Sequence, residues 1–85
     1  MNSPPKIYVN SLLTAITAVT WARHLYLNIG GLNDIDTAVQ YLNAAIDWCR
    51  YEAVHCPGRR RRIGRAYMAF ILSIERNKLV ANTAW

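Results

Sequence analysis

The sequence predicts an all-α protein, a small three-helix bundle with up-down-up topology. Three stretches carry apolar residues at helical spacing, and glycine or proline separates each stretch from the next. They cover residues 11–28, 34–56 and 60–81. Because the connections between them are short, consecutive helices are expected to lie antiparallel. The 85 residues are enough for one domain, residues 10–85, preceded by an extended arm, residues 1–9.

The first predicted helix follows an arm in which two adjacent prolines disfavour helix. Asn10 or Ser11 can provide the N-cap oxygen. Beside its larger apolar residues, the helix has a stripe of small ones, which allows another helix to approach closely. These are Ala15, Ala18 and Ala22. Since this stretch carries almost no charge, it is expected to be the most buried of the three helices.

The second predicted helix has the clearest apolar face in the chain. Gly30 and Gly31 end the helix before it, and Asn33 or Asp34 can cap it. Its apolar face consists of Ile35, Val39, Leu42, Ile46, Cys49, Ala53 and Cys56. Beside that face runs an aromatic stripe of Tyr41, Trp48, Tyr51 and His55. The stripe is expected either to pack within the bundle or to contact a partner, since tyrosine and tryptophan are frequent in interface hot spots.

The third predicted helix follows a break at Pro57-Gly58 and is apolar on two sides. One side is assigned to the core: Ile63, Tyr67, Phe70, Ile74 and Ala81. The nearly opposite side carries Met68, Leu72 and Leu79. A helix of this kind is either central or half covered from outside the domain. Met68, Leu72 and Leu79 are therefore predicted to form a homodimer interface or a docking face for a partner.

The net charge of +5 is concentrated at the start of the third helix, in five arginines. They are Arg59, Arg60, Arg61, Arg62 and Arg65. Guanidinium groups match the geometry of phosphate and carboxylate, and a helix N-terminus adds free N–H groups. The up-down-up topology is expected to bring Lys6, Arg50 and His55 to the same end. The sequence thus predicts an anion-binding or partner-binding site there.

Enzymatic activity, a cofactor and a metal site are not predicted. The chain has no Gly-rich phosphate loop or His-Glu-x-x-His motif, and its cysteines and histidines do not have the spacing of zinc ligands. Cys49 and Cys56 are seven positions apart in one helical pattern, too far for a disulfide, so a reducing, cytoplasmic location is expected. Membrane binding is disfavoured because the basic residues are bunched at one helix end.

The sequence therefore favours a non-enzymatic interaction protein, an inhibitor or adaptor. Its arginine cluster and nearby aromatic residues would dock on an anionic surface of a larger protein or nucleoprotein complex. Complexes that handle nucleic acid, including those of host defence against phage, offer such surfaces. The alternative is direct, weakly sequence-specific binding of nucleic acid through the same arginines.

Overall fold

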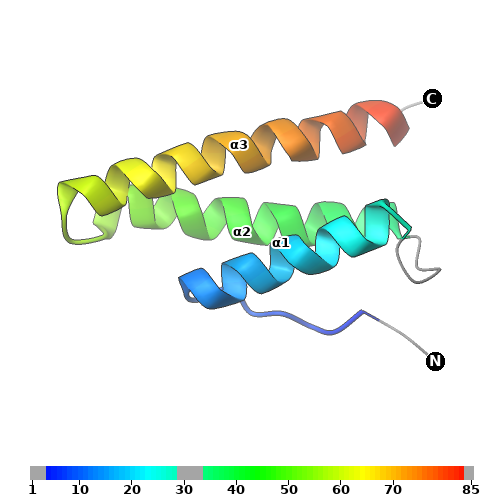
Figure 1. Ribbon diagram of the computed structural model, residues 1–85, viewed down its shortest axis with the longest axis horizontal. Coiled ribbons are helices and arrows are strands. Elements are labelled where there is room, and N and C mark those ends of the chain that lie inside the picture. Colours follow the sequence, from blue (N-terminus) through cyan, green and yellow to red (C-terminus); the bar gives the residue numbers. More distant parts are fainter. Residues whose placement is uncertain (1–3, 29–33, 84–85) are drawn as a thin grey trace.

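A computed structural model describes residues 4–28 and 34–83 of the chain (Figure 1). It contains three α-helices: α1 (Leu12–Tyr26), α2 (Ile35–His55) and α3 (Arg59–Thr83). Within the described residues there is no β-strand. The helices run in alternating directions, so the predicted up-down-up bundle is confirmed. Each helix end lies within two residues of the predicted boundary.

The starts of α1 and α2 are fixed by side-chain caps. Ser11 caps α1, because its Oγ accepts from the Thr14 N–H at 3.2 Å while the Ser11 N–H donates to Thr14 Oγ1 at 3.0 Å. Asp34 caps α2 by accepting from the Thr37 N–H at 3.0 Å. Each cap satisfies N–H groups that have no partner in the first helical turn. Gly30, Gly31 and Asn33 lie outside the described residues.

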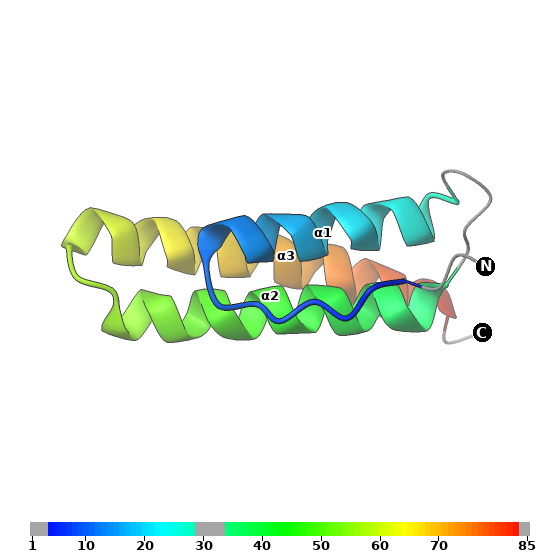
Figure 2. The ribbon, with the colours of Figure 1, turned by 90° about the horizontal axis from the view of Figure 1, so that it is seen from below.

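The central helix of the bundle is α2. Both flanking helices pack extensively against α2, whereas α1 and α3 approach each other much less closely (Figures 1 and 2). The side of α1 that reaches the core is its alanine stripe, in which Ala15, Ala18 and Ala22 are fully buried. Its larger residues Leu13 and Ile16 remain 74% and 49% exposed. Although α1 carries almost no charge, part of its apolar surface therefore stays outside the core.

The predicted core face of α3 is wrong, because the helix is rotated to present its other apolar side. Leu72 and Leu79 are buried, and Met68 packs against the core. All the residues that were assigned to the core are exposed instead: Ile63, Tyr67, Phe70, Ile74 and Ala81. Consequently Met68, Leu72 and Leu79 do not form the exposed apolar face on which the predicted dimer or partner interface depended.

Polar contacts with α2 explain this rotation. The Arg76 guanidinium donates to Asn43 Oδ1 at 2.8 Å, and the Arg65 guanidinium lies 5.2 Å from the centroid of the Trp48 ring. These contacts require the side of α3 that also carries the buried Ala69 and Leu72. Turning α3 by half a revolution would break both contacts. Hydrophobic spacing alone does not distinguish the two orientations, because both apolar sides repeat with helical period.

The N-terminal arm runs back along α2 (Figure 2). Ile7 and Val9 are half-buried against the core, and the Tyr41 hydroxyl donates to the carbonyl oxygen of Pro5. The 14 Å shortest dimension of the Cα trace, against 41 Å along the helices, shows how thin the molecule is. In so thin a bundle the arm supplies apolar cover that a fourth element would otherwise provide.

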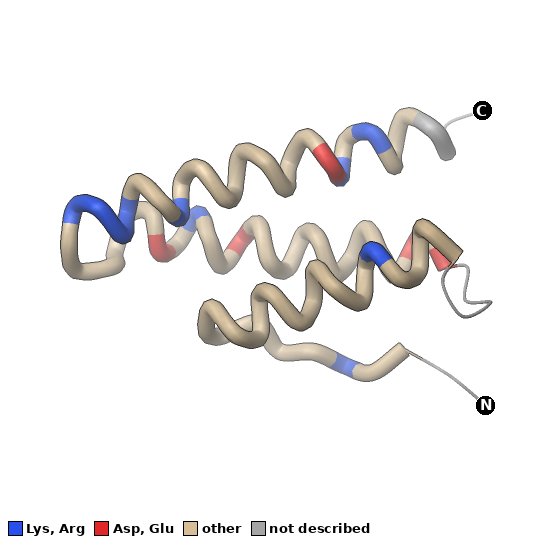
Figure 3. The backbone as a smooth tube through the Cα atoms, in the orientation of Figure 1, with Lys and Arg blue, Asp and Glu red and all other residues tan. Residues whose placement is uncertain are grey.

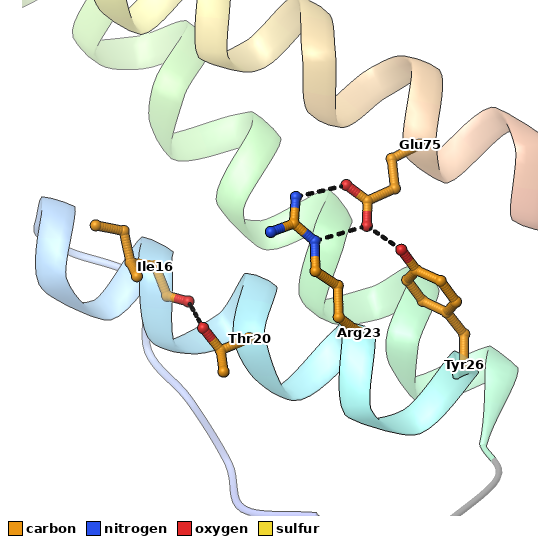
Figure 4. Close-up of polar contacts among 5 residues, drawn as sticks. All are labelled: Ile16, Thr20, Arg23, Tyr26 and Glu75. Carbon is orange, nitrogen blue, oxygen red and sulfur yellow. Dashed lines mark hydrogen bonds and ion pairs between the residues drawn. The ribbon is translucent and has the colours of Figure 1, made fainter. Parts of the chain in front are cut away.

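A three-residue polar cluster ties α1 to α3 (Figure 4). Arg23 donates to both oxygens of Glu75, from Nε and from Nη2, at 3.0 Å each, and the Tyr26 hydroxyl also donates to the carboxylate. The hydrogen bonds from Arg23 hold the pKa of Glu75 below its ordinary value of 4.5, although partial burial acts in the opposite direction. Partial burial and the bond to Glu75 raise the pKa of Tyr26.

Truncating Leu72 should destabilise the fold far more than truncating the larger Phe70. Leu72→Ala leaves a cavity in the core and should lower the free energy of unfolding by about 2–5 kcal/mol. Phe70 is 61% exposed, so Phe70→Ala should change the free energy by less than about 1 kcal/mol. Urea denaturation checks both variants. The opposite ranking would mean that α3 presents Phe70 to the core.

Protonation of Glu75 should weaken the bundle at acidic pH. Because the pKa of Glu75 is lower in the folded protein, its stabilising effect is complete above pH 4.5 and disappears as the pH falls through the folded-state pKa. Glu75→Gln should therefore cost about 0.5–1 kcal/mol at pH 7, since Arg23 is partly exposed, and less at lower pH. Urea titrations from pH 7 to pH 3 measure the difference. Asp47→Asn, at an exposed site on α2, is the control. The difference in free energy of unfolding between this variant and wild type should not shrink as the pH falls, as it does for Glu75→Gln.

Candidate functional site

The arginine cluster lies at the turn between α2 and α3, at one end of the molecule (Figure 3). Cys56 continues from α2 in an extended conformation, and Gly58 has a φ of +95°, which other residues rarely adopt. The first helical bond of α3 then runs from the Arg62 N–H to the Gly58 carbonyl at 3.2 Å. This turn places all five arginines within the first two turns of α3.

The five arginines do not form one uniform group. Arg62 donates from Nη1 to the Cys56 carbonyl at 3.2 Å and so satisfies an acceptor at the end of α2. Arg65 lies over Trp48, a cation–π contact between α3 and α2. Arg59, Arg60 and Arg61 are exposed and make no hydrogen bond or ion pair with the described part of the chain. Three of the predicted anion-binding arginines are therefore available to a ligand.

The aromatic stripe of α2 is divided in the same way. Tyr41 is buried beneath the arm and Trp48 lies under Arg65, so these two belong to the fold and not to an interface. Tyr51 is 61% exposed, and its ring centroid lies 4.3 Å from that of the exposed His55. His55 is the last residue of α2. An aromatic pair thus stands next to the exposed arginines.

Lys6 and Arg50 do not join the arginine cluster. The arm carries Lys6 away from that end, to a hollow lined also by Thr37 and Gln40 near the start of α2. The prediction assumed an arm that continues the line of α1, but the contact of Pro5 with Tyr41 turns it back. Arg50 points across to α3, where Nη2 lies 3.4 Å from Ser73 Oγ, about two helical turns beyond Arg65.

The electrostatic environment of the three exposed arginines is unusual for a helix start. The first turn of α3 contains no acidic residue. Free N–H groups and the helix dipole already make this end positive, so each added cation is unfavourable by about 0.3–1 kcal/mol at low ionic strength. A bound phosphate or carboxylate would offset this unfavourable electrostatic energy, because it can accept hydrogen bonds from both the guanidinium groups and the N-terminal N–H groups.

The two cysteines lie in the last two turns of α2 and at its C-cap, and both are buried. Cys49 and Cys56 are free thiols, 0% and 6% exposed. Burial raises the pKa of the Cys49 thiol, with Arg65 acting in the opposite direction. Across residues 4–28 and 34–83, no three His, Cys, Asp or Glu side chains come together as a metal site would require. None of the helices in these ranges combines the length and apolarity needed to cross a bilayer.

Comparison with known proteins adds no relative. No protein-family model matches the chain, and no curated protein or solved structure is significantly similar to it. Its function is therefore inferred from its own residues.

Neutralising Arg65 should destabilise the protein, whereas neutralising Arg60 should not. Arg65→Gln loses the contact with Trp48 and should lower the free energy of unfolding by about 0.5–2 kcal/mol. Arg60→Gln removes a cation from a helix N-terminus. It should leave the free energy of unfolding unchanged or raise it by roughly a few tenths of a kcal/mol. Urea denaturation at low salt compares them. Equal effects would contradict the division of the cluster into structural and available arginines.

Proposed function

We propose that this protein is a non-enzymatic interaction protein, an inhibitor or adaptor that docks on an anionic surface of a larger complex. The docking residues are Arg59, Arg60 and Arg61, flanked by Tyr51 and His55. A complex that handles nucleic acid, such as a host-defence complex, is the kind of partner that offers such a surface. The proposal includes no catalytic step, cofactor or metal.

The observation that carries the proposal is the position of three unpartnered arginines at a helix N-terminus. Their cationic groups repel one another and oppose the dipole of α3, so they lower the stability of the free protein. Unlike Arg62 and Arg65, they make no contact that the fold needs. A bound anion explains why they are there, because it offsets the repulsion and uses the fork geometry of guanidinium.

The neighbouring aromatic pair favours a protein surface over bare nucleic acid. Tyr51 and His55 lie against each other at 4.3 Å, and their interplanar angle is 37°. Aromatic residues beside arginine are typical of interface hot spots. An extended stacking platform for unpaired bases would need several separated rings along the groove that holds the strand. Direct nucleic-acid binding through Arg59–Arg61 remains the alternative, and salt dependence separates it from protein binding.

Replacing Arg59, Arg60 and Arg61 with glutamine should abolish partner binding without unfolding the protein. The triple variant leaves Arg62 and Arg65 in place, so the contacts with Cys56 and Trp48 persist. Affinity purification from the native host, with and without nuclease, measures binding. The control replaces Lys6 and Arg50 with glutamine, which removes positive charge elsewhere on the molecule.

Three results are distinguishable. Nuclease-resistant capture of a protein that only the Arg59–Arg61 variant loses supports the proposal. Binding to a plain oligonucleotide duplex with a log–log salt slope of about −3 assigns the arginines to nucleic acid instead. Equal weakening by the Arg59–Arg61 variant and by the control variant would mean that net charge alone matters, and it would overturn the site.

A further inference from the structure

The exposed side of α3 carries a stripe of large apolar residues that the bundle does not cover. Its members are Ile63, Tyr67, Phe70, Ile71 and Ile74, all between 40% and 67% exposed. They follow one another at helical spacing and so lie on one face. Contiguous apolar surface of this kind is uncommon on an isolated small protein and is typical of a binding surface.

This stripe borders a groove between α1 and α3. The groove has a volume of about 330 Å³, and Val19 and Leu72 lie deepest in it. Its walls are Ile16 and Thr20 from α1, and Tyr67, Met68 and Ile71 from α3. It exists because both helices pack on α2 while remaining apart from each other. The place that a fourth helix occupies in a four-helix bundle is thus open.

The polar cluster of Arg23, Tyr26 and Glu75 crosses between α1 and α3 at one end of this groove, which Arg23 also lines (Figure 4). Ile16 and Thr20 lie on α1 one to two turns before Arg23, on the side of the polar cluster where the groove lies. On the other side of the cluster a second hollow, of about 590 Å³, is lined by Ile71, Ile74 and Lys78. Ile71 lines both hollows. The cluster therefore holds the two helices at a fixed separation and keeps the groove from closing.

The charge on the two helices that frame the groove is almost entirely positive. On α1 the one charged residue is Arg23, and α3 carries seven basic residues and one acid, Glu75, which is paired. The other four acids are Asp34, which caps α2, and three residues of α2 itself. On the exposed face of α3, Arg60 and Lys78 lie beyond the two ends of the apolar stripe at helical spacing. The apolar stripe of α3 is thus flanked by one exposed basic residue at each end.

We propose that the groove receives an amphipathic helix with acidic flanks, contributed by the partner protein. The apolar stripe of that helix would cover Ile16, Tyr67 and Ile71, and its acidic residues would meet Arg60 and Lys78. This is the helix-in-groove mode of recognition. The inference rests on the proposed function, because it specifies the chemistry of the same partner. It shares Arg60 with that site, but its apolar contacts lie on a different surface.

Charge and chemistry disfavour the other occupants. A symmetric pair of copies, joined along α3, would bring two helices with a large excess of cations together, and like charges across an interface are unfavourable. The outer face of α2 is acidic but polar, with Asp36, Gln40 and Asp47 exposed, so it would not fill an apolar groove. Nucleic acid could contact the basic residues through its phosphates, but it has no apolar stripe that would cover the walls of the groove, so it is not favoured as the occupant.

The test uses synthetic helical peptides of about 21 residues, six turns of helix. The first peptide carries leucines at i, i+3, i+4 and i+7 with glutamate on the flanks. The second has the same composition, but its leucines are dispersed so that they form no apolar stripe. The third has lysine in place of every glutamate. The first should bind one-to-one in titration calorimetry. The other two should bind at least about tenfold more weakly.

Protein variants locate the binding. Tyr67→Glu and Ile16→Glu place an acid on each wall at exposed positions, so both should fold and should weaken binding of the first peptide by about tenfold or more. Tyr8→Glu is the matched control, because Tyr8 is 79% exposed and lies on the arm away from the groove; it should change the affinity less than about twofold. Urea denaturation verifies that each variant is folded.

The opposite results would overturn the inference. Unchanged peptide binding by folded Tyr67→Glu and Ile16→Glu proteins would exclude the groove, and equal binding of the lysine peptide would exclude an acidic partner. A protein dimer that Tyr67→Glu converts to a monomer in sedimentation would assign the groove to a second copy.

If the groove variants still capture the native partner while the Arg59–Arg61 variant does not, this inference fails and the proposed function stands. If the Arg59–Arg61 variant captures the partner normally, the proposed function fails instead.

Discussion

The close approach of α1 to α2 through alanine is the contact on which the rest of the structure depends. Ala15, Ala18 and Ala22 are fully buried, as are Ala38 and Ala45 of α2. Small side chains let two helix backbones come near each other, which makes the core thin but dense. Leu13 and Ile16 of α1 are left outside the core, whereas Val19 and Leu25 are buried in it. The small residues thus determine both how the bundle is held together and where its apolar surface appears.

The orientation of α3 has a comparable effect. Its contacts with α2 combine apolar burial at Ala69 and Leu72 with the polar contacts of Arg65 and Arg76. Buried polar partners define a rotation more sharply than apolar packing does, because a guanidinium group that loses its partner in a half-buried site is costly. Since that rotation turns Tyr67 and Phe70 outward, one side of the helix packs on α2 and the other leaves large apolar side chains exposed.

The molecule therefore offers two surfaces with different chemistry on one scaffold. Arg59–Arg61 project from the end of the bundle, where they can attract and orient an anionic partner. The groove between α1 and α3 is apolar and is kept open by the contact of Arg23 with Glu75. Most of the acids lie on α2, the helix that takes no part in the walls of the groove. Charged residues contribute mainly to the rate and selectivity of association, and apolar contacts to its strength, so the two surfaces complement each other in the proposed docking.

The class of fold and the three helices could be predicted from the sequence, because helical spacing, caps and breaks are local properties of the chain. For the first two caps the sequence left two neighbouring candidates each, and the structure identifies Ser11 and Asp34. The sequence also located the arginine cluster, since charge density needs no tertiary information. Only the tertiary structure decided that α2 is central, which apolar side of α3 is buried, and which arginines are used by the fold. Two apolar stripes on one helix have nearly equal hydrophobic burial energies, and the choice between them depends on Asn43 and Trp48, residues far away in the sequence. The position of Lys6 was unpredictable for the same reason, because it follows from the contact between Pro5 and Tyr41, residues that are 36 positions apart.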